Sequence, residues 1–217
     1  MTTDRPTTAT PKTARWTAVL AVICLMVWAA PPAEADEITE CDRLVAHPRD
    51  PDRVSDGVSR PDVDVPAATA ACEAAVTANP DNARLAYQLG RVYFYGGRVQ
   101  DAAGQIERSA GQGYRQAQFV LGAIIDNRRE GAPADICRVE ELWFKSALQG
   151  RLAAQVSYVR HVTKGLFDGC PIQATGPQLT AFIADAQARV EDYYQRLLVA
   201  DLTEDVAAYV GGTTSRE

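Results

Sequence analysis

Two histidines and two pairs of adjacent carboxylates are the side chains with which this chain could transfer protons or hold a metal ion. His47 and His161 belong to no H-x-x-x-H or H-E-x-x-H pattern, which would place two metal ligands on one helix face. Glu140-Glu141 and Glu204-Asp205 are direct neighbours, and neighbouring side chains on a helix point apart. We therefore expect no catalytic residue, no metal and no cofactor.

The amino terminus has the pattern of a secretory signal peptide. Basic residues precede an uncharged apolar stretch at 16–30, and the small-x-small sequence Ala33-Glu34-Ala35 follows it. This stretch is shorter than the roughly 20 residues needed to span a bilayer, although an uncleaved anchor is the alternative. We expect residues 1–35 to be removed and the protein to be periplasmic or secreted.

The cysteines could act as a nucleophile, as metal ligands or as disulfides. Four lie beyond the expected signal peptide, at Cys41, Cys72, Cys137 and Cys170. No two have the C-x-x-C spacing of structural zinc sites, and an oxidised cysteine lacks the thiolate that nucleophilic catalysis needs. An even number in an exported chain predicts two disulfides, with three possible connectivities.

The overall charge and the remaining motifs exclude several classes of function. The chain has 28 Asp and Glu against 22 Lys and Arg, whereas proteins that bind nucleic acid normally present a basic face. Neither a G-x-S-x-G elbow nor a phosphate-binding G-x-x-x-x-G-K motif is present. In the acidic stretch around Asp50, Asp52 and Asp56, apolar Val54 occupies the fifth position of a possible EF-hand loop, so that motif fails.

The pattern of prolines, glycines and apolar residues predicts an all-α chain. Residues 36–65 are polar and rich in proline, so we expect an irregular segment there, with a possible short element at 38–46. Helical periodicity with stop signals then predicts helices at 67–78, 83–95, 99–110, 115–127, 135–149 and from 152 onward. A stripe of apolar residues over 177–201 predicts one long final helix, followed by a short helix at 203–210.

Two short sequences recur along this helical region. SAGQG at 109–113 returns as SALQG at 146–150, and Leu89-Gly90 returns as Leu121-Gly122. Small residues at these positions allow helices to approach closely, while the leucines and tyrosines fill the gaps between them. The four aromatic residues Tyr87, Tyr93, Phe94 and Tyr95 have the same helical spacing and fit packing, with a platform for a sugar or peptide as the alternative.

Because of these recurring residues, the chain resembles members of the tetratricopeptide superfamily. Residues 67–80 resemble the second helix and closing Asn-Pro of one repeat, and 83–113 resemble the next; SAGQGYRQAQFVLG and SALQGRLAAQ are similar to the Sel-one-like variety. The resemblance implies a right-handed α-solenoid of about three helical hairpins at 66–176, with a capping helix and tail at 177–217. It also implies that the first helices of the repeats line a concave groove.

The resemblance implies a binding function rather than catalysis. Placed on this sequence, the outward positions of the first helices are Arg84, Tyr87, Arg91, Gln116, Phe119 and Arg160. Arginines there would suit a carboxylate, because the guanidinium can pair with it through two hydrogen bonds. We expect a protein or peptide partner in the cell envelope, with no nucleic acid and no membrane. The alternative is an accessory module of an envelope hydrolase or of a caspase-like peptidase system.

The repeat frame also pairs the cysteines. Cys137 and Cys170 fall at equivalent places in two successive units once the longer loop of the earlier unit is allowed for. We therefore predict a disulfide between Cys137 and Cys170, and a second between Cys41 and Cys72 that holds the irregular segment.

Overall fold

The computed structural model describes residues 1–2, 37–127 and 135–214. The chain divides into two units, Met1–Ala35 and Asp36–Glu217. The predicted signal peptide lies almost wholly outside the described residues, and every helix described belongs to the second unit.

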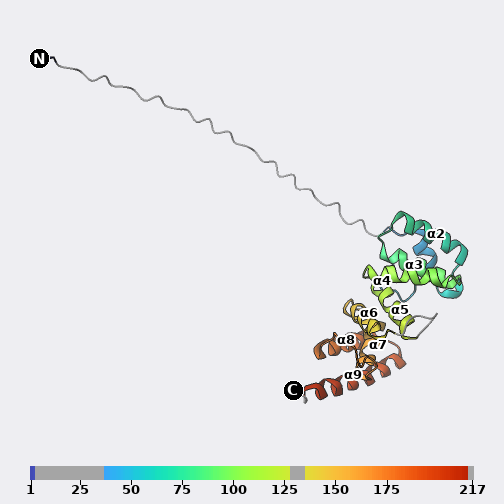
Figure 1. Ribbon diagram of the computed structural model, residues 1–217. Helices are drawn as coiled ribbons and strands as arrows, with labels where there is room; N and C mark the ends of the chain where they lie inside the picture. Colours follow the sequence, from blue (N-terminus) through green and yellow to red (C-terminus); the bar gives the residue numbers. More distant parts are fainter. Residues whose placement is uncertain (3–36, 128–134, 215–217) are drawn as a thin grey trace. The chain divides into compact units, whose positions relative to one another are not determined.

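The described part of the second unit is all-helical, and each helix packs against the next one in the sequence (Figure 1). The helices are α1, Glu40–Val45; α2, Val65–Ala78; α3, Ala83–Tyr95; α4, Val99–Gly111; α5, Arg115–Asp126; α6, Ile136–Leu148; α7, Leu152–Thr163; α8, Gly176–Arg189; and α9, Tyr193–Thr214. A short 3-10 helix, Arg60–Asp62, precedes α2. This sequential packing is that of a helical-repeat solenoid, as predicted.

Local signals set the ends of the hairpin helices. Asn82 caps α3 by accepting hydrogen bonds from the backbone of Arg84 and Leu85, and Asp135 caps α6 by accepting one from Arg138. The glycines that end the two recurring sequences, Gly113 and Gly150, have φ angles of 89° and 75°. An L-residue with a side chain rarely adopts such angles, so glycine is suited to these turns between hairpins.

The recurring serines make the same contact in two successive hairpins. Ser109 Oγ donates a hydrogen bond of 2.6 Å to the carbonyl of Ala83, at the start of α3. Ser146 Oγ donates one of 2.7 Å to the carbonyl of Arg115, at the start of α5. Each serine therefore ties the second helix of its hairpin to the beginning of the first, which explains why this sequence recurs.

The recurring glycines are points of close approach within the hairpins. A Cβ atom at Gly90 would lie 2.7 Å from the side chain of Ile106 in α4. At Gly122 a Cβ would overlap the indole of Trp143 in α6, whose Nε1 donates a 3.0 Å hydrogen bond to the carbonyl of Phe119. The close approach predicted for the Leu-Gly sequences is present at both positions.

Both predicted disulfides are present. Cys41 in α1 is bonded to Cys72 in α2, with their Cα atoms 4.6 Å apart. Cys137 in α6 is bonded to Cys170, which lies in the loop after α7, with a Cα separation of 5.2 Å. The first bond fixes α1 against the helical stack, and the second links two successive hairpins.

The predicted long final helix is two helices. Helix α8 ends at Arg189, and buried Val190 adopts an extended backbone with φ −81° and ψ 127°. Asp192 Oδ1 then accepts hydrogen bonds from the backbone N–H groups of Tyr194 and Gln195, so it caps the new helix α9. The expectation of one helix over 177–201 was wrong because the apolar stripe continued across this break. The expected short helix at 203–210 is the later part of α9.

Substitution of Gly122 tests the close contact between α5 and α6. We expect Gly122→Ala to lower the free energy of unfolding by about 1–3 kcal/mol, because the methyl group would overlap Trp143. Urea unfolding followed by circular dichroism measures this. Gly104→Ala is the matched control, since a Cβ at Gly104 in α4 meets no atom within 4 Å. The free energy of unfolding of that variant should rise by up to about 1 kcal/mol, because alanine has a higher helix propensity than glycine. Equal effects of the two substitutions would contradict the close contact at Gly122.

Candidate functional site

The six residues predicted to line an open groove lie on the first helices of the hairpins, α3, α5 and α7, but four of them are buried. The exposed fractions are 4% for Arg84, 3% for Tyr87, 5% for Arg91 and 2% for Gln116, whereas Phe119 is half-buried and Arg160 is exposed. The expected exposure of the first four was wrong. The chain's own residues 37–64, which we call the N-terminal segment, contact this face and cover its first part.

An ion pair without access to solvent attaches α1 to α3. Arg84 Nη1 donates to a carboxylate oxygen of Asp42, and the same oxygen accepts a 2.8 Å hydrogen bond from the side-chain amide of Gln88. The other Asp42 oxygen accepts from Thr39, the residue that caps α1. A buried carboxylate needs neighbouring donors to satisfy its hydrogen-bonding capacity, and Gln88 and Thr39 supply them for Asp42.

Arg91 holds the backbone of the N-terminal segment at two places. Its Nη1 donates to the carbonyl of Val45 at the end of α1, and its Nη2 donates to the carbonyl of Val58 at 2.7 Å. Its Nε donates to the hydroxyl of Tyr95 at 2.7 Å. One guanidinium therefore binds both ends of the connection 46–58, which we call the strap.

Two aspartates of the strap reach helix α5 and the residue before it. Tyr114 donates a 2.8 Å hydrogen bond to Asp50, and Arg115 binds both carboxylate oxygens of Asp52 at 2.7 and 2.5 Å. Burial raises the pKa of Asp50, and burial together with Asp50 raises the pKa of Tyr114. The Arg115–Asp52 pair has the two-pronged geometry that arginine uses to recognise carboxylates.

Below the strap, polar side chains form a row across successive hairpins. Gln116 donates to the hydroxyl of Tyr87 at 3.1 Å and accepts from Nε of Arg151 at 2.6 Å. The guanidinium of Arg151 also lies 5.2 Å from the centre of the Phe119 ring. Burial lowers the pKa of Arg151. The face of the first helices is thus polar even where it is buried, unlike the apolar contacts between helices.

The two histidines have separate surroundings. His161 packs edge-on to Trp143, with ring centres 4.7 Å apart, and its Nε2 lies 3.3 Å from Asp126. His47 lies in the strap, where its Nδ1 accepts a 3.0 Å hydrogen bond from the backbone of Arg49. Burial, with further contributions from Arg91 and two other arginines, lowers the pKa of His47 to about 4. The structure does not bring these histidines together.

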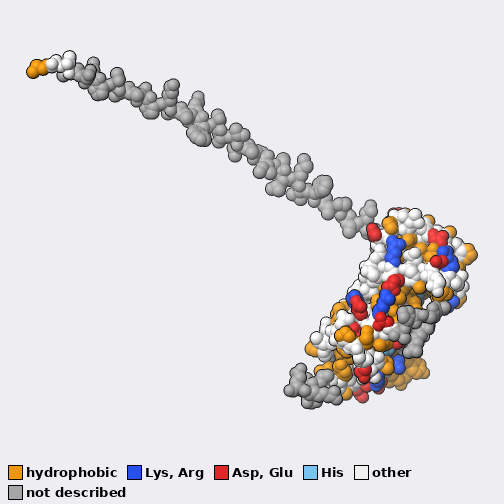
Figure 2. Space-filling view, viewed as in Figure 1, with side chains coloured by type: hydrophobic (Ala, Val, Ile, Leu, Met, Phe, Trp, Pro, Cys, Tyr) orange, Lys and Arg blue, Asp and Glu red, His pale blue; other side chains and the backbone are white. Residues whose placement is uncertain are grey.

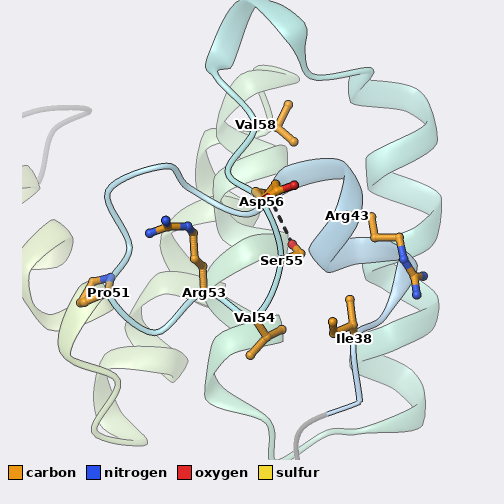
Figure 3. Close-up of a pocket in the computed structure, with 8 residues that line it drawn as sticks. All are labelled: Ile38, Arg43, Pro51, Arg53, Val54, Ser55, Asp56 and Val58. Carbon is orange, nitrogen blue, oxygen red and sulfur yellow. Dashed lines mark hydrogen bonds between the residues drawn. The ribbon is translucent and has the colours of Figure 1, made fainter.

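A shallow hollow on the outer side of the strap is lined only by residues of the N-terminal segment. Figure 3 shows the lining residues: Arg43 comes from α1 and Ile38 precedes that helix, whereas Pro51, Arg53, Val54, Ser55, Asp56 and Val58 belong to the strap. Ser55 Oγ donates to the carbonyl of Asp42 at 2.6 Å and also lies 3.4 Å from that of Asp56. Because no repeat helix contributes to it, this hollow is not part of the face of the first helices.

A second, more enclosed cavity of about 330 Å³ lies among α3, α4 and α5. Its walls include Phe94 and Tyr95 from α3, Ala103 from α4, and Val120 from α5. Three of the four aromatic residues considered as a platform line it, namely Tyr87, Phe94 and Tyr95, while Tyr93 instead donates a 2.8 Å hydrogen bond to Glu73. Sequence reasoning missed the cavity, and the spacing of these aromatics was the signal that pointed towards it.

Among residues 1–2, 37–127 and 135–214, no three His, Cys, Asp or Glu side chains gather closely enough to hold a metal ion. In the same residues, no helix combines the length and the apolar character needed to cross a membrane.

Comparison with solved structures finds a similarity to a repeat protein. No known protein-family profile matches the sequence, and no curated protein matches it. The structure is similar to the crystal structure of a Sel1 repeat protein from Oxalobacter formigenes, with a TM-score of 0.48 and 16% sequence identity. The match covers 66% of this chain and 65% of that one, just under two thirds of its length.

Proposed function

We propose that this chain is an exported, non-enzymatic repeat protein that binds a protein or peptide partner in the cell envelope through the face of α3, α5 and α7. The observation that carries the proposal is that this face already binds a peptide segment, although the segment belongs to the same chain. Arg91 binds two backbone carbonyls and Arg115 binds a carboxylate. These are the groups through which an extended peptide is recognised.

The N-terminal segment occupies only the first part of this face. It covers α3 and reaches the start of α5 through Tyr114 and Arg115. Farther along, Phe119 on α5 is half-buried and Arg160 on α7 is exposed. A partner therefore binds the later part of the face and competes with the strap where the two meet.

The charge distribution and the disulfides support this role. On the face viewed in Figure 2, basic and acidic side chains are interspersed rather than gathered into one large patch. Recognition then depends on local pairs such as Arg115–Asp52 rather than on a long-range field. The two disulfides fit an oxidising compartment, which supports the predicted export.

Charge reversal at Arg160 tests the binding face. The tagged chain is used to recover its partner from an envelope extract, and Arg160→Glu should lower recovery of one discrete partner by about fivefold, the equivalent of about 1 kcal/mol. Lys145→Glu is the matched control, because Lys145 is an exposed cation on α6, a second helix. Asp52→Asn, which frees Arg115, should raise recovery. Equal recovery with the Arg160 and Lys145 variants would remove the support for this face.

The low pKa of His47 predicts how the packing of the strap responds to pH. The folded chain keeps His47 neutral down to about pH 4, whereas the unfolded chain takes up a proton near pH 6.5. Stability is therefore lost as the pH falls through this window. Asp50, whose pKa is raised, acts in the opposite direction. As the pH is lowered from 7.5 to 4, we expect the midpoint temperature of thermal unfolding of the His47→Gln variant to rise relative to that of the unaltered chain. Asp50 is common to both proteins, and parallel pH profiles would show that the His47 ring is not shielded from solvent in the folded chain.

A further inference from the structure

The cavity among α3, α4 and α5 has the size of a small-molecule site. Its volume is about 330 Å³, and pockets that hold small ligands measure about 300–1,000 Å³. The full lining is His47, Arg60, Tyr87, Arg91, Phe94, Tyr95, Val99, Ala102, Ala103, Ile106, Val120 and Ile124. Most of this wall is aliphatic or aromatic, so the group that fits inside it is apolar.

Three polar residues of the wall, Arg91, Tyr95 and Tyr87, already have hydrogen-bond partners in the protein. Arg91 donates through Nε to Tyr95 and through its two Nη atoms to the carbonyls of Val45 and Val58. The hydroxyl of Tyr87 accepts from Gln116. A sugar or a peptide backbone would bring several hydrogen-bonding groups into this space and leave them poorly satisfied, which costs free energy. A hydrocarbon chain carries no such groups.

The edge of the cavity carries a cation without a matching anion. Arg60 is exposed, and its guanidinium lies 4.9 Å from the ring centre of Tyr95 and 5.6 Å from that of Phe94. Within the described part of the chain Arg60 forms no ion pair, and the lining contains no Asp or Glu. A guanidinium this close to aromatic rings keeps N–H groups that can donate to a carboxylate.

We propose that this cavity binds a small apolar carboxylic acid, with the hydrocarbon chain among α3, α4 and α5 and the carboxylate paired with Arg60. The apolar wall favours the hydrocarbon chain of the ligand, and Arg60 at the edge of the cavity favours its carboxylate. This site differs in chemistry from the peptide-binding face, although Tyr87 and Arg91 belong to both.

Calorimetric titration of the full chain with decanoate and with decanol tests the proposal, because the two probes share a tail and differ in the charge of the head group. Decanoate should bind about tenfold more tightly than decanol, the difference expected for a charge-assisted pair. Arg60→Gln should reduce the affinity for decanoate to that for decanol and leave decanol unchanged. Arg53→Gln is the charge-matched control, since Arg53 lies on the strap and outside the cavity lining.

A substitution that fills the cavity distinguishes binding of the hydrocarbon chain inside it from adsorption of the probes to the protein surface. Ala103 is exposed at the mouth on α4, so Ala103→Trp can occupy the space without disturbing the core, and it should abolish binding of both probes. Gln100→Trp, at an exposed position of α4 outside the lining, should leave binding intact. Circular dichroism verifies that each variant is folded.

Three results would overturn the proposal: equal affinity for the two probes, no loss with Arg60→Gln, or tighter binding of an acetylated peptide that ends in phenylalanine. The last would assign the cavity to the carboxyl terminus of a peptide. Ala103→Trp should leave recovery of the partner through Arg160 unchanged, so failure of this site is distinguishable from failure of the peptide-binding face.

Discussion

The buried ion pair between Asp42 and Arg84 is the interaction on which the position of the N-terminal segment depends. Both side chains are almost without solvent, so removal of either would leave an uncompensated buried charge, at a cost of about 3–5 kcal/mol. Gln88 and Thr39 complete the hydrogen bonding of Asp42, and the Cys41–Cys72 disulfide bonds the same helix to α2. With α1 held in this way, the strap starts at a fixed point above α3.

The position of α1 determines how the strap covers the face of α3, α5 and α7. The strap leaves α1 at Val45 and returns near Val58, and Arg91 binds the carbonyls at both points. Between them the strap extends to Tyr114 and Arg115. The polar row of Tyr87, Gln116 and Arg151 is buried as a result, but its hydrogen bonds are kept. Polar residues on this face are therefore compatible both with the covered state and with recognition of another peptide.

The helical hairpins themselves are held by a different kind of contact. Gly90 and Gly122 bring the two helices of a hairpin together, and Ser109 and Ser146 tie the second helix to the start of the first. Small side chains on α4, such as Ala103, leave space between this helix and α5, and the cavity lies there. The same preference for small residues that allows close packing inside a hairpin thus leaves an apolar space between hairpins.

The sequence by itself determined most of the helices and their order, and the resemblance to repeat proteins added the pairing of the cysteines. Helix ends depend on groups within one or two turns, such as Asn82 and Gly113, so the bounds of α3 were predicted without error. The break at Val190 is also local, but a continuous apolar stripe hid the capping role of Asp192.

Only the tertiary structure decided which surface is covered. Asp42 meets Arg84 across 42 residues of chain, and Asp52 meets Arg115 across 63. No local pattern specifies contacts of that range, because they depend on where the whole stack places each face. For the same reason the burial of Arg84 and Arg91, and the cavity beside Arg60, were not evident from the sequence.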